Sequence, residues 1–263
     1  MKLCMMTYTM RRQGFSLKDI IQTAVDLELE GIDWVTTYGY AANELRKMSS
    51  DAGLTVVCHT FFCDKLTNGE SDWLDEVKQS VEDAVMLDAP IVMIPTCCKP
   101  GLDRDSSRDF WINALLKIAP VTDNAGITLT IENFPGSDSA FITAADYYKA
   151  KTILPQLKLT YDNGNAAFGE DPVESFRLSA EDVVHAHFKD WYISNQPEKE
   201  CLDSIIGKYF RPALIGEGDI DTAACWNIMR DSNYSGFINI EYESSDIPAV
   251  EAMSKAVKYL RSL

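Results

Sequence analysis

Ionisable side chains stand at the carboxyl ends of several short apolar segments of this 263-residue chain. Glu132 and Asp162 lie at the ends of two such segments, and Glu241 and Glu243 lie at the end of the last one. Charged groups are costly to bury unless they are paired or bind a metal ion. Several such groups at the same ends of successive segments therefore indicate a functional site. The ionisable residues at these ends are His59, Glu132, Asp162, His185, His187, Lys189, Asp190, Glu241 and Glu243.

One subset of these groups has the composition of a divalent-metal site. This subset consists of Glu132, Asp162, one histidine of the seventh segment and one glutamate of the eighth. Its side chains offer three oxygens and one nitrogen as ligands. That hard set suits Mn²⁺, Mg²⁺ or Co²⁺ better than a thiolate-bound zinc. His185 and His187 point the same way because strand side chains repeat every second residue. His187 is favoured as the metal ligand because it lies nearer the carboxyl end of the strand. Glu241 is favoured over Glu243, which enters the turn. Any one of these groups alone is more often a salt-bridge partner or a helix cap, but four in consecutive segments favour a site.

The segments that position these groups belong to a unit that recurs eight times: an apolar, β-branched run, a polar turn and a stretch of helical period. The runs are nearly continuous in apolar residues, as parallel strands covered by helices are. Eight units predict an α/β fold, a (β/α)8 TIM barrel, and such a barrel uses about 250 residues as one domain. We therefore expect a single domain over residues 1–263. The alternative, a doubly wound open sheet, would show a Gly-rich turn after the first strand, and residues 6–10 contain none. Strands are expected at Leu3–Thr9, Gly31–Thr37, Leu54–Phe61, Ile91–Thr96, Thr128–Asn133, Lys158–Asp162, Val183–Lys189 and Gly236–Glu243, and helices near 16–30, 42–52, 70–88, 106–125, 143–153, 171–180, 219–231 and 246–262.

One connection is far longer than the short loops typical of this fold. Residues 190–218 separate the seventh strand from the next helix, and they include Trp191 and Tyr192. A long aromatic loop at the catalytic face predicts a lid or a substrate wall. The alternative is a surface excursion without a function.

The composition excludes several classes of partner. Forty Asp and Glu against twenty-four Lys and Arg leave a formal charge of −16, whereas a nucleic acid or an anionic membrane surface requires a basic face. No apolar run reaches the roughly 18 residues that span a bilayer, and the first residues lack a signal-peptide core. The seven cysteines contain no CxxC zinc motif. They are interpreted as free thiols of a reducing compartment, so a cytoplasmic location is expected.

Five motifs occur in order along the chain: IEN at 131–133, YDNGN at 161–165, HAHFKD at 185–190, GEGDID at 216–221 and IEYE at 240–243. They resemble the xylose-isomerase-like TIM-barrel superfamily, whose members include ketose 3-epimerases, hydroxypyruvate isomerases and inosose dehydratases. The resemblance covers essentially the whole chain and is specific to the superfamily rather than to a substrate. It implies Glu132, Asp162, His187 and Glu241 as the metal ligands.

The chain departs from one pattern of these relatives. Asn165 stands where ketose 3-epimerases and the related DNA-repair endonucleases often have a histidine. The chain has only three histidines, which cannot supply the multi-metal cluster of the endonucleases. That activity is therefore excluded, in agreement with the acidic charge.

The resemblance implies a metal-dependent isomerase or epimerase that acts on a ketose or related polyol through an enediolate. Mn²⁺ is the expected ion, with Mg²⁺, Co²⁺ or Zn²⁺ as alternatives, and Glu132 and Glu241 are the expected acid–base pair. Three of the expected substrate contacts have a structural alternative. The histidine can be a satisfied strand-end residue, the lysine can form an ion pair with Asp190 or with the loop glutamate, and that glutamate can fix its own loop. The expected contacts are His59, Asn165, Lys189, Glu217 and Trp191.

Two other functions stay open. A lyase or dehydratase on a keto-sugar or inosose would use the same enediolate, and Asn165 mildly favours it because it changes the acid–base set. A catalytically inactive sugar-binding barrel would have a substituted metal ligand, and none of the four is substituted. In each case the expected partner is a small carbohydrate. A sugar phosphate is possible, but a neutral polyol or ketose is preferred because no Gly-rich phosphate turn follows the seventh or eighth strand. Homo-oligomers are common in the family, but the sequence fixes no stoichiometry.

Overall fold

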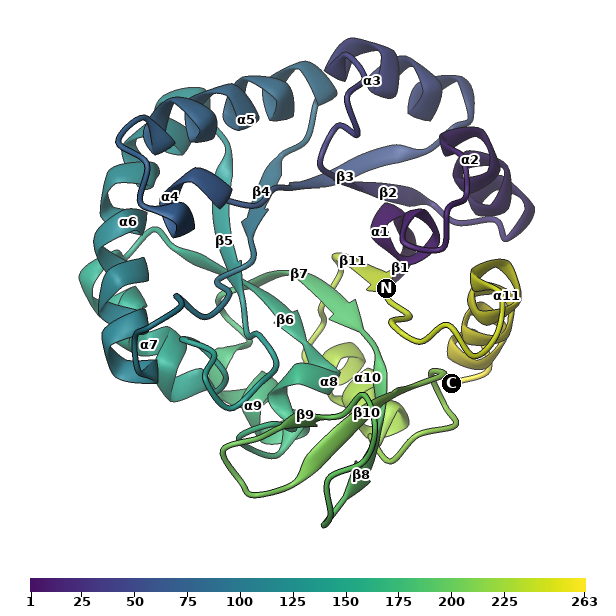
Figure 1. Ribbon diagram of the computed structural model, residues 1–263. Helices are drawn as coiled ribbons and strands as arrows, with labels where there is room; N and C mark the ends of the chain where they lie inside the picture. Colours follow the sequence, from purple (N-terminus) through teal and green to yellow (C-terminus); the bar gives the residue numbers. More distant parts are fainter.

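The computed structural model describes residues 1–263 and contains a closed barrel of eight parallel strands. The ring closes where β1 (Lys2–Met6) pairs with β11 (Phe237–Ile240), as Figure 1 shows. This closure confirms the predicted TIM barrel and excludes the open doubly wound sheet. The other barrel strands are β2 (Gly31–Val35), β3 (Thr55–Thr60), β4 (Ile91–Ile94), β5 (Thr128–Glu132), β6 (Lys158–Asp162) and β7 (Val183–Phe188), and the order around the ring is β1-β11-β7-β6-β5-β4-β3-β2.

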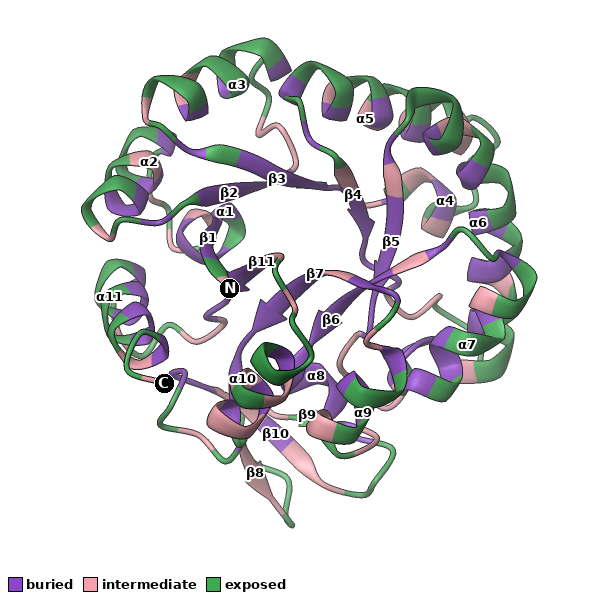
Figure 2. Cartoon of the chain, turned by 180° about the vertical axis from the view of Figure 1, so that it is seen from behind, coloured by how far each residue is buried: buried purple, intermediate pink, exposed green.

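Eight longer helices surround the barrel and cover the outer side of its strands. Figure 2 shows the strands largely buried and the helices exposed on their outer sides. Local sequence fixes several starts: Ser16 and Thr143 form capping boxes, and Pro172 follows the N-cap Asp171. No helix has both the length and the apolar character needed to cross a membrane. The eight helices are α2 (Leu17–Asp26), α3 (Ala42–Asp51), α5 (Trp73–Leu87), α6 (Arg104–Ala125), α7 (Ala144–Ile153), α9 (Pro172–Ser179), α10 (Thr222–Asp231) and α11 (Ala249–Leu260).

Three short helices that the sequence pattern did not predict follow barrel strands at their carboxyl ends. They are α1 (Thr7–Arg11), α4 (Asp64–Asn68) and α8 (Asn163–Ala166). The first strand was expected to reach Thr9, but it ends at Met6. The reason lies in Thr7, whose hydroxyl donates to the carbonyl of Asp33 and accepts from the N–H of Val35. The side chain thus binds the neighbouring strand where the backbone ladder stops.

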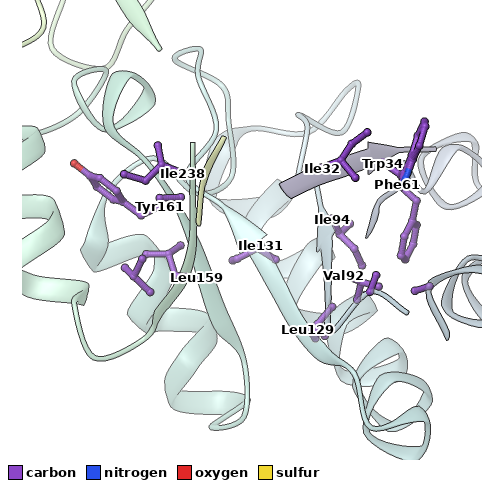
Figure 3. Close-up of a cluster of buried hydrophobic side chains, with 14 of the residues drawn as sticks. Ile32, Trp34, Phe61, Val92, Ile94, Leu129, Ile131, Leu159, Tyr161 and Ile238 are labelled. Carbon is purple, nitrogen blue, oxygen red and sulfur yellow. The ribbon is translucent and has the colours of Figure 1, made fainter. Parts of the chain in front are cut away.

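Alternation along the strands divides the barrel into an outer core and an inner polar face. Side chains such as Ile131, Tyr161 and Ile238 pack outward in the main hydrophobic core, part of which is drawn in Figure 3. Successive strand residues point to opposite faces. Glu132 and Asp162, which follow two of these apolar residues, therefore point into the barrel. The fold thus gathers the ionisable residues that the sequence leaves scattered.

The long connection after β7 folds into a small antiparallel sheet rather than an irregular loop. Its strands are β8 (Asp190–Ser194), β9 (Leu202–Asp203) and β10 (Tyr209–Ala213), in the order β8-β10-β9. The sheet approaches α8 so closely that a Cβ on Gly164 would lie 2.8 Å from Trp191 Nε1. Glycine at 164 is therefore required by close packing of the excursion against the barrel mouth.

Candidate metal centre

Four inward-facing side chains form a compact group at the carboxyl end of the barrel. Glu132 ends β5, Asp162 ends β6, His187 lies one residue before the end of β7, and Glu241 follows β11. One potential ligand atom from each lies within 4.8 Å of the others. His187 Nδ1 is 2.7 Å from Glu132 Oε1 and 3.6 Å from Glu241 Oε2. These four residues are called the acidic cluster below.

The acidic cluster contains buried atoms that make no hydrogen bond within the protein. They are Asp162 Oδ2, Glu241 Oε2 and His187 Nε2. The two carboxylate oxygens lie beside the Lys189 ammonium, at 3.3 and 3.0 Å, and His187 Nε2 faces Asp33. A single ammonium leaves part of the negative charge of these buried carboxylates uncompensated, which is costly. Carboxylate oxygens and one imidazole are ligands that divalent cations accept. The donor set therefore fits a divalent metal ion and leaves open which one.

Two asparagines hold Asp162 in place. Its backbone N–H donates to Asn133 Oδ1, and its carbonyl accepts from Asn133 Nδ2, both at 2.8 Å. Its Oδ1 accepts a 2.7 Å hydrogen bond from the backbone N–H of Asn165, where the aspartate caps α8. The backbone and one oxygen of Asp162 are thus fixed, and Oδ2 remains for a ligand.

Lys189 carries the positive charge nearest to the acidic cluster. Its Nζ lies 2.8 Å from Glu243, 3.0 Å from Glu241 and 3.3 Å from Asp162. These carboxylates raise the pKa of the lysine well above its ordinary value despite its burial. The acids considered from the sequence as its partners, Asp190 and Glu217, form no ion pair with it. One ammonium group therefore neutralises part of the acidic cluster.

Burial raises the pKa of two carboxyl groups of the acidic cluster, those of Asp162 and Glu241. For Asp162 the pKa rises to about 7, chiefly through burial and also through the charge of Glu132. Burial also raises the pKa of Glu241 well above its ordinary value. Burial alone would lower the pKa of His187, but neighbouring carboxylates, Glu132 first, outweigh it and raise that pKa. The cluster thus carries excess negative charge, which protons or a cation relieve.

A cavity of about 200 Å³ opens onto the acidic cluster. Glu132 and Glu241 line it, whereas Asp162 and His187 lie behind its surface. The cluster therefore presents two carboxylates to a bound molecule and keeps two ligands out of its reach. The remaining charged lining is Arg12, Lys189 and Glu243, and the apolar lining includes Met6, Val35, Phe62, Met93 and Phe134.

Two of the residues expected to contact substrate lie outside this cavity. His59 packs beside Phe61 on the outer face of β3, and its Nδ1 is 2.9 Å from the carbonyl of Trp34. Thr60, the next residue, points inward and lines the cavity instead. Trp191 is buried in a small hydrophobic cluster and makes an edge contact with Phe168. It therefore anchors the excursion and forms no wall of the cavity.

Of the other three expected contacts, Lys189 lines the cavity, whereas Asn165 and Glu217 do not. Asn165 is fully buried in α8, and both polar atoms of its side chain lack a hydrogen bond, although it does not line the cavity. Glu217 is exposed. The loop that contains Glu217 is held by Asp190 instead. The Asp190 carboxylate accepts hydrogen bonds from the backbone N–H groups of Gly216, Gly218 and Ile220.

Sequence reasoning missed two charged residues beside the acidic cluster. Asp33 of β2 is fully buried, and its Oδ2 lies 3.8 Å from His187 Nε2. The signal was a single acid inside the apolar run Gly31–Val35. Arg12 lines the cavity and donates to the backbone carbonyl of Glu243. No local pattern marked Arg12, because it lies in a turn far from the later strands.

Comparison with known proteins places the chain in a family. The sequence model described as Xylose isomerase-like TIM barrel matches residues 21–263. The chain belongs to this family. Among curated relatives, the inosose dehydratase of Lacticaseibacillus casei is 28% identical over 161 residues, which are 58% of this chain and 54% of that protein. The chain spans about half the length of the curated relatives it matches.

Solved structures agree with this chain in fold over nearly their whole length. The 3-keto-D-glucoside 4-epimerase YcjR from E. coli is 16% identical, with a TM-score of 0.76 and full coverage of both chains. The IOLI protein with a bound zinc atom is also 16% identical, with a TM-score of 0.77 and coverage of 99% of this chain and 96% of that one. At these identities the likeness establishes the barrel fold alone.

Proposed function

We propose that this protein is a divalent-metal-dependent isomerase or epimerase that acts on a ketose or a related polyol. The observation that carries the proposal is the division of the acidic cluster: Glu132 and Glu241 line the cavity, while Asp162 and His187 stand behind them. Epimerisation removes a proton from one face of a carbon and returns one to the opposite face, so it uses two groups that face the substrate. The two residues behind them support the site without touching the substrate.

Glu132, Asp162, His187 and Glu241 would hold the metal ion. A bound divalent ion supplies Lewis acidity, which polarises a substrate carbonyl and acidifies the neighbouring C–H. Mn²⁺ is the ion we propose, because the set has three oxygen donors and no thiolate.

The two glutamates would move the proton. They reach the cavity from β5 and from the end of β11, which β6 and β7 separate. One carboxylate removes a proton from the carbon next to the carbonyl, and the other returns one. Return to the opposite face of the same carbon gives an epimer, and return to the neighbouring carbon gives an aldose–ketose isomer.

The rest of the cavity suits a polyol. Lys189 and Arg12 supply N–H donors for hydroxyl groups, and Met6, Val35 and Phe62 supply apolar surface for the C–H faces of a sugar. Apolar lining also keeps water from the reacting carbon, which strengthens the interaction of the glutamates with the substrate.

A dehydratase is the second candidate, favoured by the relatedness to inosose dehydratases. The same removal of a proton next to a carbonyl, followed by loss of a hydroxyl from the adjacent carbon, expels water. Asn165 agrees with this alternative because it supplies no imidazole for a second proton transfer.

The test is an assay of the Mn²⁺-loaded protein on a panel of ketoses and inososes, with mass spectrometry of the products in D₂O. A product that carries solvent deuterium and no other change in mass supports the isomerase or epimerase, and a product lighter by one water supports the dehydratase. Glu241→Gln should lower kcat by about 10²–10⁴-fold, as expected for loss of an acid–base group. Glu251→Gln, an exposed glutamate of α11 paired with Lys255, is the matched control. Full turnover by Glu241→Gln would overturn the proposal.

A further inference from the structure

The two ring nitrogens of His187 face different carboxylates. Nδ1 points to the acidic cluster, 2.7 Å from Glu132 Oε1. Nε2 makes no hydrogen bond, and the acid near it is Asp33, with Oδ2 at 3.8 Å. A neutral imidazole carries one N–H and one lone pair. Which nitrogen offers the lone pair therefore decides whether His187 can bind a cation at the cluster.

Asp33 is held rigidly by side chains from other strands. Thr60 Oγ1 of β3 donates to it, at 3.1 Å from Oδ1 and 3.2 Å from Oδ2. Asn239 Nδ2 of β11 donates to Oδ2 at 2.7 Å. The carboxylate is completely buried. Asp33 is therefore an immobile hydrogen-bond acceptor beside the acidic cluster.

His185 also lies near Asp33, but its hydrogen bonding excludes it as the proton donor. The amide of Asn239 must turn its N–H₂ group toward the carboxylate, and its oxygen accepts from Cys4 Sγ at 2.7 Å. The same Nδ2 lies 3.1 Å from His185 Nε2. An amide nitrogen only donates, so His185 Nε2 accepts and carries no proton. Its separation of 3.6 Å from Asp33 is thus a contact without a hydrogen bond.

The geometry points to Asp33 as a positioning residue that accepts the Nε2–H of His187 and so holds Nδ1 unprotonated toward the metal. Metal-binding histidines commonly donate their other N–H to a carboxylate, which fixes the tautomer and the ring orientation. A shift of about 1 Å would bring the 3.8 Å separation within hydrogen-bond range. The inference rests on the proposed function only in requiring that the acidic cluster binds a metal ion. Cys4, Asp33, Thr60, His185 and Asn239 are called the interior network below.

The first test measures metal affinity in Asp33→Asn. Titration with Mn²⁺, followed through the EPR signal of the free ion, should show affinity about 10–100-fold weaker than in the unmodified protein. The matched control is Asp146→Asn, which also replaces a buried aspartate, one that pairs with Arg104 and Arg108. It should lose stability and keep its Mn²⁺ affinity. Equal affinity in Asp33→Asn and the unmodified protein, or equal weakening in both variants, would overturn the inference.

The second test reads the tautomer directly and does not depend on a variant that folds. The chain contains three histidines, so their imidazole ¹⁵N and ¹H signals can be resolved in the Zn²⁺-loaded protein. His187 should show a protonated Nε2, whose proton is protected from exchange, and a metal-bound Nδ1. Zinc on Nε2 of His187 contradicts the inference while leaving the metal site intact. Failure of the unmodified protein to bind either ion would instead overturn the proposed function.

Discussion

The acidic cluster and the interior network are two groups of buried polar residues inside the same barrel, and they differ in how well their atoms are satisfied. In the interior network, Cys4, Asn239, Thr60 and Asp33 form a continuous chain of hydrogen bonds. In the acidic cluster, Asp162 Oδ2 and Glu241 Oε2 have no hydrogen bond and lie beside the ammonium group of Lys189. Satisfied hydrogen bonds hold neighbouring strands together, whereas buried polar atoms that lack one need an explanation, and a bound ion is such an explanation. The difference indicates which group maintains the barrel and which receives a ligand.

His187 belongs to the acidic cluster and also touches the interior network. It pairs with Glu132 on one side and approaches Asp33 on the other. The orientation of His187 is therefore set in part by Asp33, which does not line the cavity. The predictions below ask whether the two groups respond to metal as differently as their hydrogen bonds indicate.

The largest effect on stability is expected for Lys189→Met. The change removes the ammonium group that lies within 3.3 Å of Asp162, Glu241 and Glu243. Loss of one partner from a buried ion pair costs about 3–5 kcal/mol, so the metal-free variant should unfold at a much lower urea concentration. Metal should restore more stability in this variant than in the unmodified protein, because it replaces the missing positive charge. Urea titrations with and without Mn²⁺ measure both effects, and an unchanged metal-free midpoint would contradict the assigned role of Lys189.

A pH dependence of intermediate size is expected in the metal-free protein. The pKa of Asp162 is raised to about 7 in the folded chain, from about 4 when unfolded. Between these values the folded state binds more protons, so this contribution to stability is complete below about pH 4 and is lost as the pH rises through about 7. The raised pKa of Glu241 has the same sign.

The measurement is the free energy of unfolding of the metal-free protein at pH 6 and pH 8. Stability should be lower at pH 8, and saturating Mn²⁺ should remove or reverse the difference, because metal binding requires the ionised carboxylates. Asp162→Asn, which cannot ionise, should show a flatter profile. Equal profiles in the variant and the unmodified protein would remove Asp162 as the source.

The smallest effect is expected in the interior network, for Cys4→Ala. The change removes the thiol that donates to Asn239 Oδ1 and leaves a small void at a fully buried position. We expect a loss of about 1–2 kcal/mol in the free energy of unfolding. The increase in stability that Mn²⁺ produces should stay the same, since no atom of the acidic cluster is altered. A loss of the metal response would erase the distinction between the two groups.

The sequence predicts the barrel and much of its acidic cluster for one physical reason. Parallel strands carry their carboxyl ends to the same side, so Glu132, Asp162, His187 and Glu241 converge whatever the loops do. Position relative to the strand end selects His187 over His185 and Glu241 over Glu243, because alternation places both members of each pair on the same face. What these residues bind and catalyse stays a prediction.

Contacts between distant segments are what the sequence does not reveal. The run that contains Asp33 reads as a core strand, and only the closed barrel shows that Thr60 and Asn239 meet it. A shift of one residue in strand phase separates His59, which faces outward, from Thr60, which lines the cavity. The length of residues 190–218 signals an insertion, but the pairing of β8 with β10 depends on packing around Trp191.

The most direct test of the account is a Mn²⁺ titration of the metal-stripped protein beside Asp162→Asn, with metal bound per chain and the unfolding midpoint measured on the same samples. The account predicts one ion per chain and a clear rise in the midpoint for the unmodified protein, and neither for the variant. Asp162→Asn keeps the size of the side chain, and its amide oxygen can still accept the cap of α8. Equal binding and equal stabilisation in both proteins, or no binding in the unmodified one, would contradict the claim that the acidic cluster is a metal centre.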